Sequence, residues 1–386
     1  MPTKKQAVQG PIVQVLARLY YGGAEILAKN LAEQYASAGR SNELWIFYRA
    51  AAISPGDDAV QLAEDTMLEE LRHAGVVCRF LDKKPGGSYL PTWRNLRRLA
   101  KQIKPSLVHV HLEEISFHTT VALTGSRIPI VQTIHSTLVR RSGLLRHYFK
   151  RRHKRFIAIS HDVMDVLSEH GITQPQAVYI RNGIRTARFA NDRDSARPVR
   201  EIVSVASLTP VKNHELLIKA MGLLRDRWIR ENRNPDILPK VRFIGEGILR
   251  PKLESLINEL NLGSYFLLSG ASNQVHEDLK QADIFTLASD YEGISIALME
   301  GMASLLPITV TNMTGAKELI RHRETGTVVD IGSHQQMADA WYELILDSDL
   351  RQHYARNIQA DVPSLDLSYT SDHYLQVYDE ILTRRV

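Results

Sequence analysis

The chain has 386 residues, 44% of them hydrophobic and 24% charged, which suits a soluble globular protein of two domains with about 190 residues each. Its single cysteine, Cys78, excludes an internal disulfide framework and a cysteine metal cluster, so a reduced cytosolic setting is expected. No segment approaches the roughly 18 consecutive apolar residues of a membrane span, and we expect no signal peptide because no apolar segment follows the first residues.

Charge is divided unevenly along the chain. Residues 1–190 contain 27 Lys and Arg against 15 Asp and Glu, a net charge of +12, whereas residues 191–386 contain 21 against 28, a net charge of −7. This difference predicts two domains whose surfaces meet different partners. The stretch 191–198 is polar and ends in Pro198, so it is predicted to be the hinge between them.

Apolar runs alternate with helical segments through the first half. The runs that read as buried strands are residues 12–17, 44–47, 76–80, 106–111, 128–134, 156–160 and 178–184. A helix is predicted after the first run, to about residue 38, and a basic helix over residues 93–103. This repeated strand–helix order predicts an α/β domain with a parallel, doubly wound sheet.

The first strand-to-helix turn contains Gly22 and Gly23. Two glycines at such a turn allow a ligand to approach the backbone closely, since no side chain is in the way. The pair is equally compatible with a flexible turn that binds nothing.

Three histidines occur where predicted strands end, at His109, His111 and His135. Parallel sheets bind ligands at the carboxyl ends of their strands. A single strand histidine is nevertheless more often part of the core, which is our interpretation of His109. A metal site is rejected, because no Asp, Glu or Cys shares the spacing of these histidines.

Residues 139–156 contain eight basic side chains and no acidic one, interleaved with Leu, Tyr and Phe. As a helix this stretch would be basic and amphipathic, and it could rest on an anionic membrane leaflet. A solvated basic face is the equally weighted alternative. Nucleic-acid binding is disfavoured because no recognised nucleic-acid-binding fold surrounds the stretch.

The strand–helix order resumes in the second half. Strands are predicted at residues 201–206, 241–247, 265–270 and 282–287, with helices from residue 214 and over residues 295–303. The last of these strands and the helix 295–303 enclose a loop that ends at Gly293. The free amides of Ile294, Ser295 and Ile296 are predicted to face an anion at the start of the helix.

Two carboxylates bracket this helix start: Glu292 in the loop and Glu300 about two turns into the helix. A carboxylate would repel a phosphate, so these side chains are better suited to accept hydrogen bonds from neutral hydroxyls. The hydroxyls of a sugar and a ribose meet that need. Taken alone, the spacing also fits a solvated loop residue and a helix-capping residue.

The Glu292-x7-Glu300 spacing resembles the E-x7-E element of retaining glycosyltransferases with the GT-B fold, most closely those of family 4. Further sequence segments along residues 11–385 are similar to that family, in order and at the expected spacing. The matching positions are the Gly22-Gly23-Ala-Glu turn, the Thr-x-His end at His135, an Asn-Gly-Ile at 182–184 and the lysine Lys212.

The sequence departs from the family pattern at three places. Ser207 stands where the family usually has an arginine that meets the donor diphosphate, so one phosphate cation is missing; Arg181 or Arg185 could replace it. Leu305 stands at a usual glycine, and Gly301 at a usual alanine.

The resemblance implies a GT-B architecture: two Rossmann-like doubly wound domains that face each other across a cleft. The acceptor-binding domain would comprise residues 1–190, closed by a C-terminal helix at 369–386, and the sugar-nucleotide-binding domain residues 191–368.

The resemblance also implies roles for the site residues. Lys212, Ser207 and the amides after Gly293 would meet the donor diphosphate, and Gly22 and Gly23 would lie near its phosphates. Glu292 would hold the sugar, Glu300 the ribose and His135 the opposite side of the sugar.

The expected activity is transfer, with retention and without metal or another cofactor, from a nucleotide-diphosphate sugar to a glycan or lipid-linked acceptor. A UDP-sugar is favoured, as is a role in bacterial surface polysaccharide or lipopolysaccharide biosynthesis. The enzyme would be cytoplasmic, and residues 139–156 could hold it peripherally on the inner face of the membrane. Two alternatives stay open: a sugar-nucleotide epimerase or hydrolase of similar fold, and a non-catalytic nucleotide-sugar-binding partner.

Overall fold

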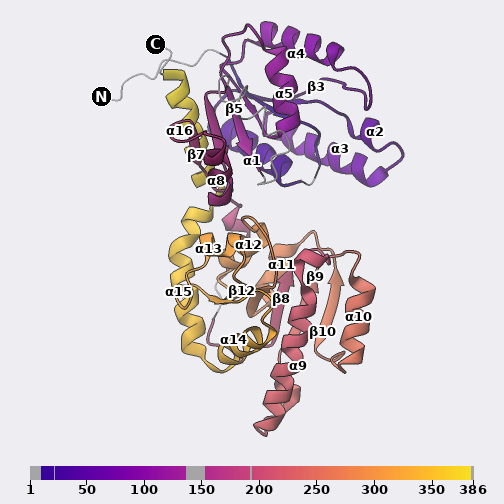
Figure 1. Ribbon diagram of the computed structural model, residues 1–386, viewed down its shortest axis with the longest axis vertical. Coiled ribbons are helices and arrows are strands. Elements are labelled where there is room, and N and C mark those ends of the chain that lie inside the picture. The colour runs from indigo at the N-terminus through magenta and orange to yellow at the C-terminus, as the bar shows by residue number, and fades with distance from the viewer. Residues whose placement is uncertain (1–9, 21, 136–152, 192–193, 384–386) are drawn as a thin grey trace. The chain divides into compact units, whose positions relative to one another are not determined.

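The computed structural model describes residues 10–20, 22–135, 153–191 and 194–383. The chain forms two compact units, drawn in Figure 1. The first comprises Met1–Asn182 with Leu367–Val386, and the second comprises Gly183–Asp366. Among the described residues, no helix is both long enough and apolar enough to cross a membrane.

The first unit is built on a parallel sheet in the order β3-β2-β1-β4-β5-β6-β7. Its strands are β1 Ile12–Leu16, β2 Asn42–Ile46, β3 Val77–Phe80, β4 Leu107–Val110, β5 Ile130–Ile134, β6 Arg155–Ala158 and β7 Ala177–Tyr179. Its helices are α1 Gly23–Ser37, α2 Ala50–Ile53, α3 Asp58–His73, α4 Leu90–Ile103, α5 Glu113–Ala122, α8 His161–Glu169 and α16 Leu367–Thr383. The central strands are buried along their whole length, which is why they consist of almost continuous apolar runs.

The C-terminal helix α16 returns to the first unit, where Figure 1 shows it in yellow beside α8 and β7. Its residues Tyr374 and Tyr378 are completely buried. The Tyr378 hydroxyl lies 2.7 Å from His109 Nδ1, and Thr370 Oγ1 donates to the Arg181 carbonyl at 2.9 Å. The last helix is therefore an integral part of the first core.

The second unit repeats the plan with a parallel sheet in the order β10-β9-β8-β11-β12-β13. Its strands are β8 Glu201–Val205, β9 Lys240–Ile244, β10 Phe266–Gly270, β11 Ile284–Leu287, β12 Ile308–Thr311 and β13 Thr327–Val329. Its helices are α9 His214–Arg230, α10 Arg250–Glu259, α11 Val275–Gln281, α12 Ile296–Ala303, α13 Thr314–Leu319, α14 His334–Leu346 and α15 Ser348–Leu365, with short 3-10 turns at η2 Thr186–Arg188, η3 Pro210–Lys212 and η4 Pro235–Ile237. The prediction of two Rossmann-like doubly wound domains is confirmed.

The units divide at a different place from the predicted boundary at residue 190. The predicted strand 178–184 ends at Tyr179, and Ile184 and Phe189 belong to the core of the second unit. The expected hinge 191–198 is also held there at its C-terminal end. Arg351 donates to the carbonyls of residues 195–197 at 2.9–3.1 Å, and Arg197 Nε donates to Asp283 Oδ1 at 2.6 Å.

The basic stretch 139–156 lies almost entirely outside the described residues, which resume at His153. The predicted helix cannot extend to residue 156, because β6 begins at Arg155. Arg155 Nη2 lies 3.5 Å from Glu380 of α16, so this cation is used within the first unit.

Candidate functional site

The loop between β11 and α12 is fixed from two sides. The Asp290 amide donates to the Val211 carbonyl at 2.9 Å, and Asn213 Nδ2 donates to Asp290 Oδ1 at 2.8 Å. The Gly315 amide at the start of α13 donates to the Glu292 carbonyl at 3.0 Å. Because β8 and β11 are neighbours in the sheet, the loops that follow them meet at its carboxyl edge. The site is thus assembled from segments about 80 residues apart in sequence.

Lys212 and Glu292, both predicted site residues, form an ion pair. Lys212 Nζ lies 2.5 Å from Glu292 Oε1, and both side chains are largely buried. Ser289 Oγ donates to the other carboxylate oxygen at 3.1 Å. The ion pair thereby holds the Lys212 ammonium and the Glu292 carboxylate side by side at the edge of the sheet.

The space around Gly293 is open. A Cβ built on this glycine would have no atom within 4 Å, whereas a Cβ on Gly315 would lie 1.8 Å from the Gly293 carbonyl oxygen. Among the described residues, none accepts a hydrogen bond from the amides of Ile294, Ser295 and Ile296. The Ser295 side chain caps the helix by accepting from the Leu298 amide at 3.3 Å. These amides are therefore free at the start of α12, and their binding of an anion stays a prediction.

Glu300 lies on α12, and its carboxylate accepts no hydrogen bond from the described residues. Burial raises its pKa to about 7, an effect that the positive charge of Arg188 opposes. A carboxylate in this state binds water poorly and has free acceptor positions, so hydroxyl donors from a ligand would satisfy it.

Ser207 follows β8 and is exposed, with its hydroxyl 3.4 Å from that of Thr209. Two glycines bring a neighbouring turn close to it. A Cβ on Gly245 would lie 2.0 Å from the Ala206 carbonyl oxygen, and a Cβ on Gly247 would lie 2.4 Å from the Leu208 carbonyl oxygen. The Gly-x-Gly turn at residues 245–247 therefore serves close backbone packing at the same edge.

The two unusual residues around the end of α12 have structural explanations. A Cβ on Gly301 would lie 2.6 Å from the Phe285 ring, so a tight helix–strand contact requires glycine there. Leu305 has a φ of +56°, the left-handed conformation that glycine adopts without strain. The backbone turn expected of a glycine is thus kept although the residue is leucine.

In the first unit, His135 follows β5, and its buried Nε2 has no hydrogen-bond partner among the described residues. Burial lowers its pKa to about 4, so the imidazole is neutral at pH 7. Gly22 precedes α1 with extended backbone, and a Cβ there would lie 2.3 Å from Glu25 Oε2. A Cβ on Gly23 would meet nothing within 4 Å, so the start of α1 is open.

The interpretation of His109 as a core residue is confirmed by its partners. Its Nδ1 contacts Tyr378, and its Nε2 lies 2.8 Å from Thr133 Oγ1. Both ring nitrogens are occupied, and burial lowers its pKa to about 3.

No local sequence signal pairs His111 with Gln14, yet the two residues form a defined hydrogen-bond chain. Gln14 Nε2 donates to the Ala28 carbonyl at 3.1 Å, so Gln14 Oε1 is the acceptor that lies 2.9 Å from His111 Nε2. The proton of neutral His111 therefore sits on Nε2, and its buried Nδ1, which has no partner in the described part of the chain, is an acceptor. Its ring centre lies 5.7 Å from that of His135.

Other contributors were also missed, namely Asp290 with Asn213 and Arg188 near Glu300. Among the residues that were missed, only His111 had a sequence signal, namely its position at the end of a predicted strand. The remaining contacts depend on which loops the sheet order brings together.

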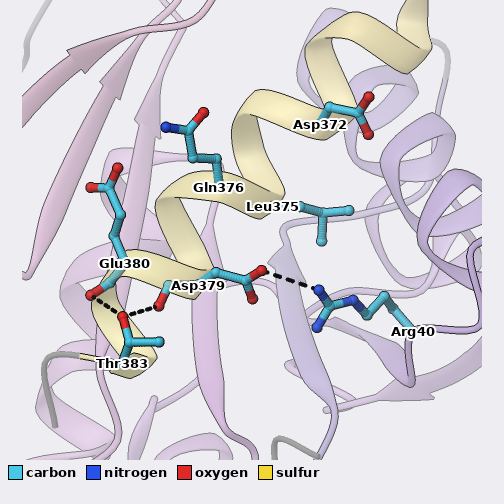
Figure 2. Close-up of a pocket in the computed structure, with 7 residues that line it drawn as sticks. All are labelled: Arg40, Asp372, Leu375, Gln376, Asp379, Glu380 and Thr383. Atoms are coloured by element: carbon cyan, nitrogen blue, oxygen red, sulfur yellow. Dashed lines mark hydrogen bonds and ion pairs between the residues drawn. The ribbon is translucent and has the colours of Figure 1, made fainter. Parts of the chain in front are cut away.

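A groove of about 520 Å³ lies along α16 in the first unit, as Figure 2 shows. Arg40, just before β2, forms an ion pair at 3.2 Å with Asp379 of α16. Asp372 and Glu380 also line the groove. It is at the amino edge of the sheet and its carboxylates would repel a diphosphate, so it is not a donor site.

Two family profiles match the chain. One, described as "Glycosyl transferases group 1", matches residues 187–361, and the other, "Glycosyltransferase Family 4", matches residues 21–188.

Curated relatives are bacterial glycosyltransferases. The N-acetylgalactosamine-N,N'-diacetylbacillosaminyl-diphospho-undecaprenol 4-alpha-N-acetylgalactosaminyltransferase of Campylobacter jejuni is 31% identical over 205 residues. That match covers 52% of this chain and 53% of the relative, so the chain spans about half the length of that protein. The UDP-Gal:alpha-D-GlcNAc-diphosphoundecaprenol alpha-1,3-galactosyltransferase of Escherichia coli is 23% identical, with 70% of this chain and 77% of the relative covered.

The Anabaena HepE protein, solved in complex with UDP, has the same fold. Its TM-score is 0.79 at 17% identity, and the match covers 96% of this chain and 100% of that one. The two family profiles together extend without a break from residue 21 to residue 361, and the fold agrees with them. The chain therefore has the GT-B fold, and its two halves match two glycosyltransferase family profiles, family 4 in the first half and group 1 in the second.

Proposed function

We propose that the protein transfers a sugar, with retention of anomeric configuration, from a nucleotide-diphosphate sugar to a glycan or lipid-linked acceptor. A UDP-sugar is the favoured donor. The observation that carries the proposal is the edge of the second sheet, where Lys212 and the free amides of residues 294–296 surround the open space at Gly293. Cations and helix amides suit a diphosphate, and the two carboxylates suit hydroxyls.

In this proposal the Lys212–Glu292 ion pair holds the site ready before the donor binds. The donor diphosphate competes with Glu292 for the lysine, and Glu292 then accepts from a sugar hydroxyl. As the glycosidic bond ionises, negative charge grows on the leaving diphosphate. Lys212 and the amides at the start of α12 stabilise that charge, and the diphosphate accepts the proton of the attacking hydroxyl on the same face.

Glu300 is proposed to bind the ribose diol and His135 to bind the donor sugar. A neutral imidazole can donate to or accept from a hydroxyl without adding charge beside the anomeric carbon. Gly22 and Gly23 are proposed to let the donor phosphates approach the open start of α1. No metal or other cofactor has a role in this mechanism.

The setting we propose is bacterial surface polysaccharide or lipopolysaccharide biosynthesis at the cytoplasmic face of the membrane. The names of the Campylobacter and Escherichia relatives specify diphosphoundecaprenol-linked acceptors, which supports a lipid-linked acceptor here. The HepE complex contains UDP, which supports a uridine donor. Contact of residues 139–156 with an anionic leaflet remains part of the proposal.

A non-catalytic nucleotide-sugar-binding partner is the second candidate, and Ser207 is the observation that favours it. An exposed serine, hydrogen-bonded to Thr209, stands where the family's phosphate-binding arginine is expected. Such a protein would bind the donor without turnover.

The first experiment is a thermal-shift panel of UDP-, GDP-, ADP- and dTDP-sugars. The donor that binds selectively should raise the melting temperature by mass action. Release of the nucleoside diphosphate is then measured with and without an undecaprenyl-diphosphate glycan acceptor. Acceptor-dependent release supports transfer, acceptor-independent release supports a hydrolase or epimerase, and donor binding without release supports the non-catalytic partner.

The anomeric configuration of the product, read by NMR coupling constants, tests retention. An inverted product would contradict the mechanism above. Undiminished activity in excess EDTA is expected for a metal-independent enzyme, and activity restored only by a divalent cation would contradict that part of the proposal.

A further inference from the structure

Helix α4 presents an uncompensated basic strip on the outside of the first unit, where Figure 1 labels it at the edge of the fold. Thr92, Leu96 and Ala100 form its buried face. Its exposed cations are Arg94, Arg97, Arg98 and Lys101. At about 100° per residue these four project within an arc of about 100°, and they extend along about 10 Å of the helix axis. We call these four residues the α4 strip.

The cations of the α4 strip repel one another. Arg94 and Arg98, and Arg97 and Lys101, are four residues apart, where like charges destabilise a helix. No acidic residue occurs between Asp82 and Glu113 in the sequence. Among the described residues, none of the four cations forms an ion pair. Arg98 donates to the neutral amide oxygen of Asn95, at 2.8 Å.

Two half-buried arginines on other helices have acidic partners. Arg250 on α10 lies within 3.2 Å of both Glu246 and Glu254. Arg227 on α9 pairs with Glu231 and Asp339 at 3.0–3.1 Å. Exposed cations without an acidic partner among the described residues also occur elsewhere, for example Arg230 on α9, but the α4 strip gathers four of them on one face of one helix.

The helix dipole explains only part of the strip. A cation near the C-terminus of a helix is stabilised by the dipole, which accounts for Lys101 in the last turn. Arg94 lies in the second turn, nearer the positive end, and the first turn contains no acidic residue to offset it. The arrangement is thus unfavourable within the unit and becomes favourable when an external anionic surface meets it.

We propose that the α4 strip is a docking surface for an anionic lipid bilayer. A bilayer leaflet offers distributed charge over a plane, which matches four cations along one convex helix face. At the start of the helix, Leu90 is 47% exposed and can enter the interfacial layer. The nearby aromatic rings are engaged inside the unit: Tyr89 stacks on His118 at 3.3 Å, and Trp93 Nε1 lies 3.2 Å from His118 Nδ1. Rings held in this way are not available to stack on bases, so the strip fits lipid better than nucleic acid.

The α4 strip would bring the enzyme to a lipid-linked acceptor, and this purpose rests on the proposed function. The binding of the strip to a bilayer does not depend on it. Binding to vesicles is measured without donor or acceptor. The two proposals can therefore fail separately.

The test is co-sedimentation of the full chain with vesicles of phosphatidylcholine containing one-third phosphatidylglycerol, compared with pure phosphatidylcholine. The strip variant replaces all four residues by glutamine, a similarly good helix former: Arg94→Gln, Arg97→Gln, Arg98→Gln and Lys101→Gln. We expect its partition coefficient on the anionic vesicles to fall at least ~100-fold, since each cation near such a surface contributes several-fold to binding.

The matched control removes four exposed cations of the second unit, and it also lowers the formal net charge from +5 to +1. Its substitutions are Lys219→Gln, Arg230→Gln, Lys240→Gln and Lys252→Gln. It should bind the anionic vesicles like the wild-type protein. A conservative variant, with Lys at positions 94, 97 and 98, should retain binding, which excludes misfolding as the cause of any loss.

Three results would overturn the proposal. These are unchanged binding by the strip variant, equal loss in the strip variant and the control, and equal binding of the wild-type protein to neutral vesicles. Tighter binding to a short RNA than to anionic vesicles, abolished by the same strip variant, would instead assign the surface to nucleic acid and also contradict the proposal.

Discussion

The carboxyl edges of the two sheets contain opposite kinds of chemistry. In the first unit the part of the edge formed by β4 and β5 contains His109, His111 and His135, whose pKa values are all lowered by burial, so this group is polar but uncharged at pH 7. In the second unit the edge is charged: Lys212 and Glu292 form an ion pair beside the open space at Gly293. The same fold therefore supports two different electrostatic environments.

The difference indicates how the tasks of a transferase could be divided. A charged edge with free helix amides can stabilise a leaving diphosphate, where charge changes during the reaction. A neutral, buried edge can orient hydroxyls by hydrogen bonds without disturbing that charge. If this division is correct, substitutions in the second unit should affect catalysis and donor affinity, and substitutions in the first should affect stability and orientation.

Removal of the cation from the charged edge should have the largest effect. Lys212→Ala is expected to lower kcat on the order of 10²–10³-fold, comparable with the loss of one oxyanion-hole donor, since its interaction strengthens in the transition state. The measurement is steady-state kinetics with the donor selected by the thermal-shift panel.

The exposed Lys219→Ala of α9 is the control and should leave kcat unchanged. Ser207→Arg, introduced into Lys212→Ala, should restore part of the activity if a cation at 207 reaches the same phosphates. A Lys212→Ala enzyme that kept most of its kcat would show that this loop does not stabilise the leaving group.

The next effect is expected at Glu300, whose carboxyl has a raised pKa of about 7 because of burial. Glu300→Gln should weaken donor binding about 10- to 150-fold, the equivalent of roughly 1.5–3 kcal/mol for a charge-assisted pair of hydrogen bonds. As the pH falls below about 7, the wild-type carboxyl becomes protonated and should lose affinity, whereas the glutamine variant should show no such dependence. Isothermal titration at several pH values measures both.

The contribution of Glu300 to folding stability should depend on pH in the opposite sense to its contribution to donor affinity. The folded state binds a proton at Glu300 between the ordinary pKa of 4.5 and about 7, where the unfolded state does not, so this group makes the protein less stable as the pH rises through that range. Glu300→Gln should therefore raise the melting temperature at pH 8 relative to wild type, while the exposed Glu259→Gln should not. Native donor affinity in the variant would exclude the ribose role.

Much of this organisation could be predicted from local sequence. The runs of buried apolar residues predicted both parallel sheets, because strands covered on both faces require such runs. The loop at Gly293 and its two glutamates were predicted because a strand end, a glycine and a helix start are adjacent in the chain. Lys212 was predicted through the family resemblance.

What could not be predicted depends on contacts between distant segments. Ile184 and Phe189 contain no local signal that assigns them to the second core, so the boundary was placed too late. The chain from Ala28 through Gln14 to His111 joins a helix and two strands, and only the sheet order brings them together. Asn213 meets Asp290 for the same reason.

The neutral edge is expected to respond through stability. Gln14→Met keeps the side-chain volume but leaves the buried Nε2–H of His111 without its acceptor. The free energy of unfolding should fall by about 1–3 kcal/mol, the usual cost of an unsatisfied buried polar group. Urea unfolding measures this change, and kcat should fall far less than in Lys212→Ala.

Nitrogen NMR of the imidazoles gives an independent check of the same chain. His111 should have its proton on Nε2 in the wild-type protein, as the Gln14 acceptor requires. Detection of the Nδ1–H form would contradict the hydrogen-bond chain. The conservative surface change Gln34→Met on α1 serves as the control and should alter neither the tautomer nor the stability by more than about 0.5 kcal/mol.

The smallest expected effect lies at the end of α12, the helix that carries the charged edge. Leu305 adopts a φ of +56°, where any side chain costs about 1–2 kcal/mol relative to glycine. Leu305→Ala loses partly buried contacts and keeps this strain, whereas Leu305→Gly loses similar contacts and relieves it. We therefore expect the glycine variant to be more stable than the alanine variant by about 1 kcal/mol, the reverse of the order inside a helix. Thermal unfolding of the two variants decides the matter, and an alanine variant more stable than the glycine variant would show that this turn does not strain the helix above it.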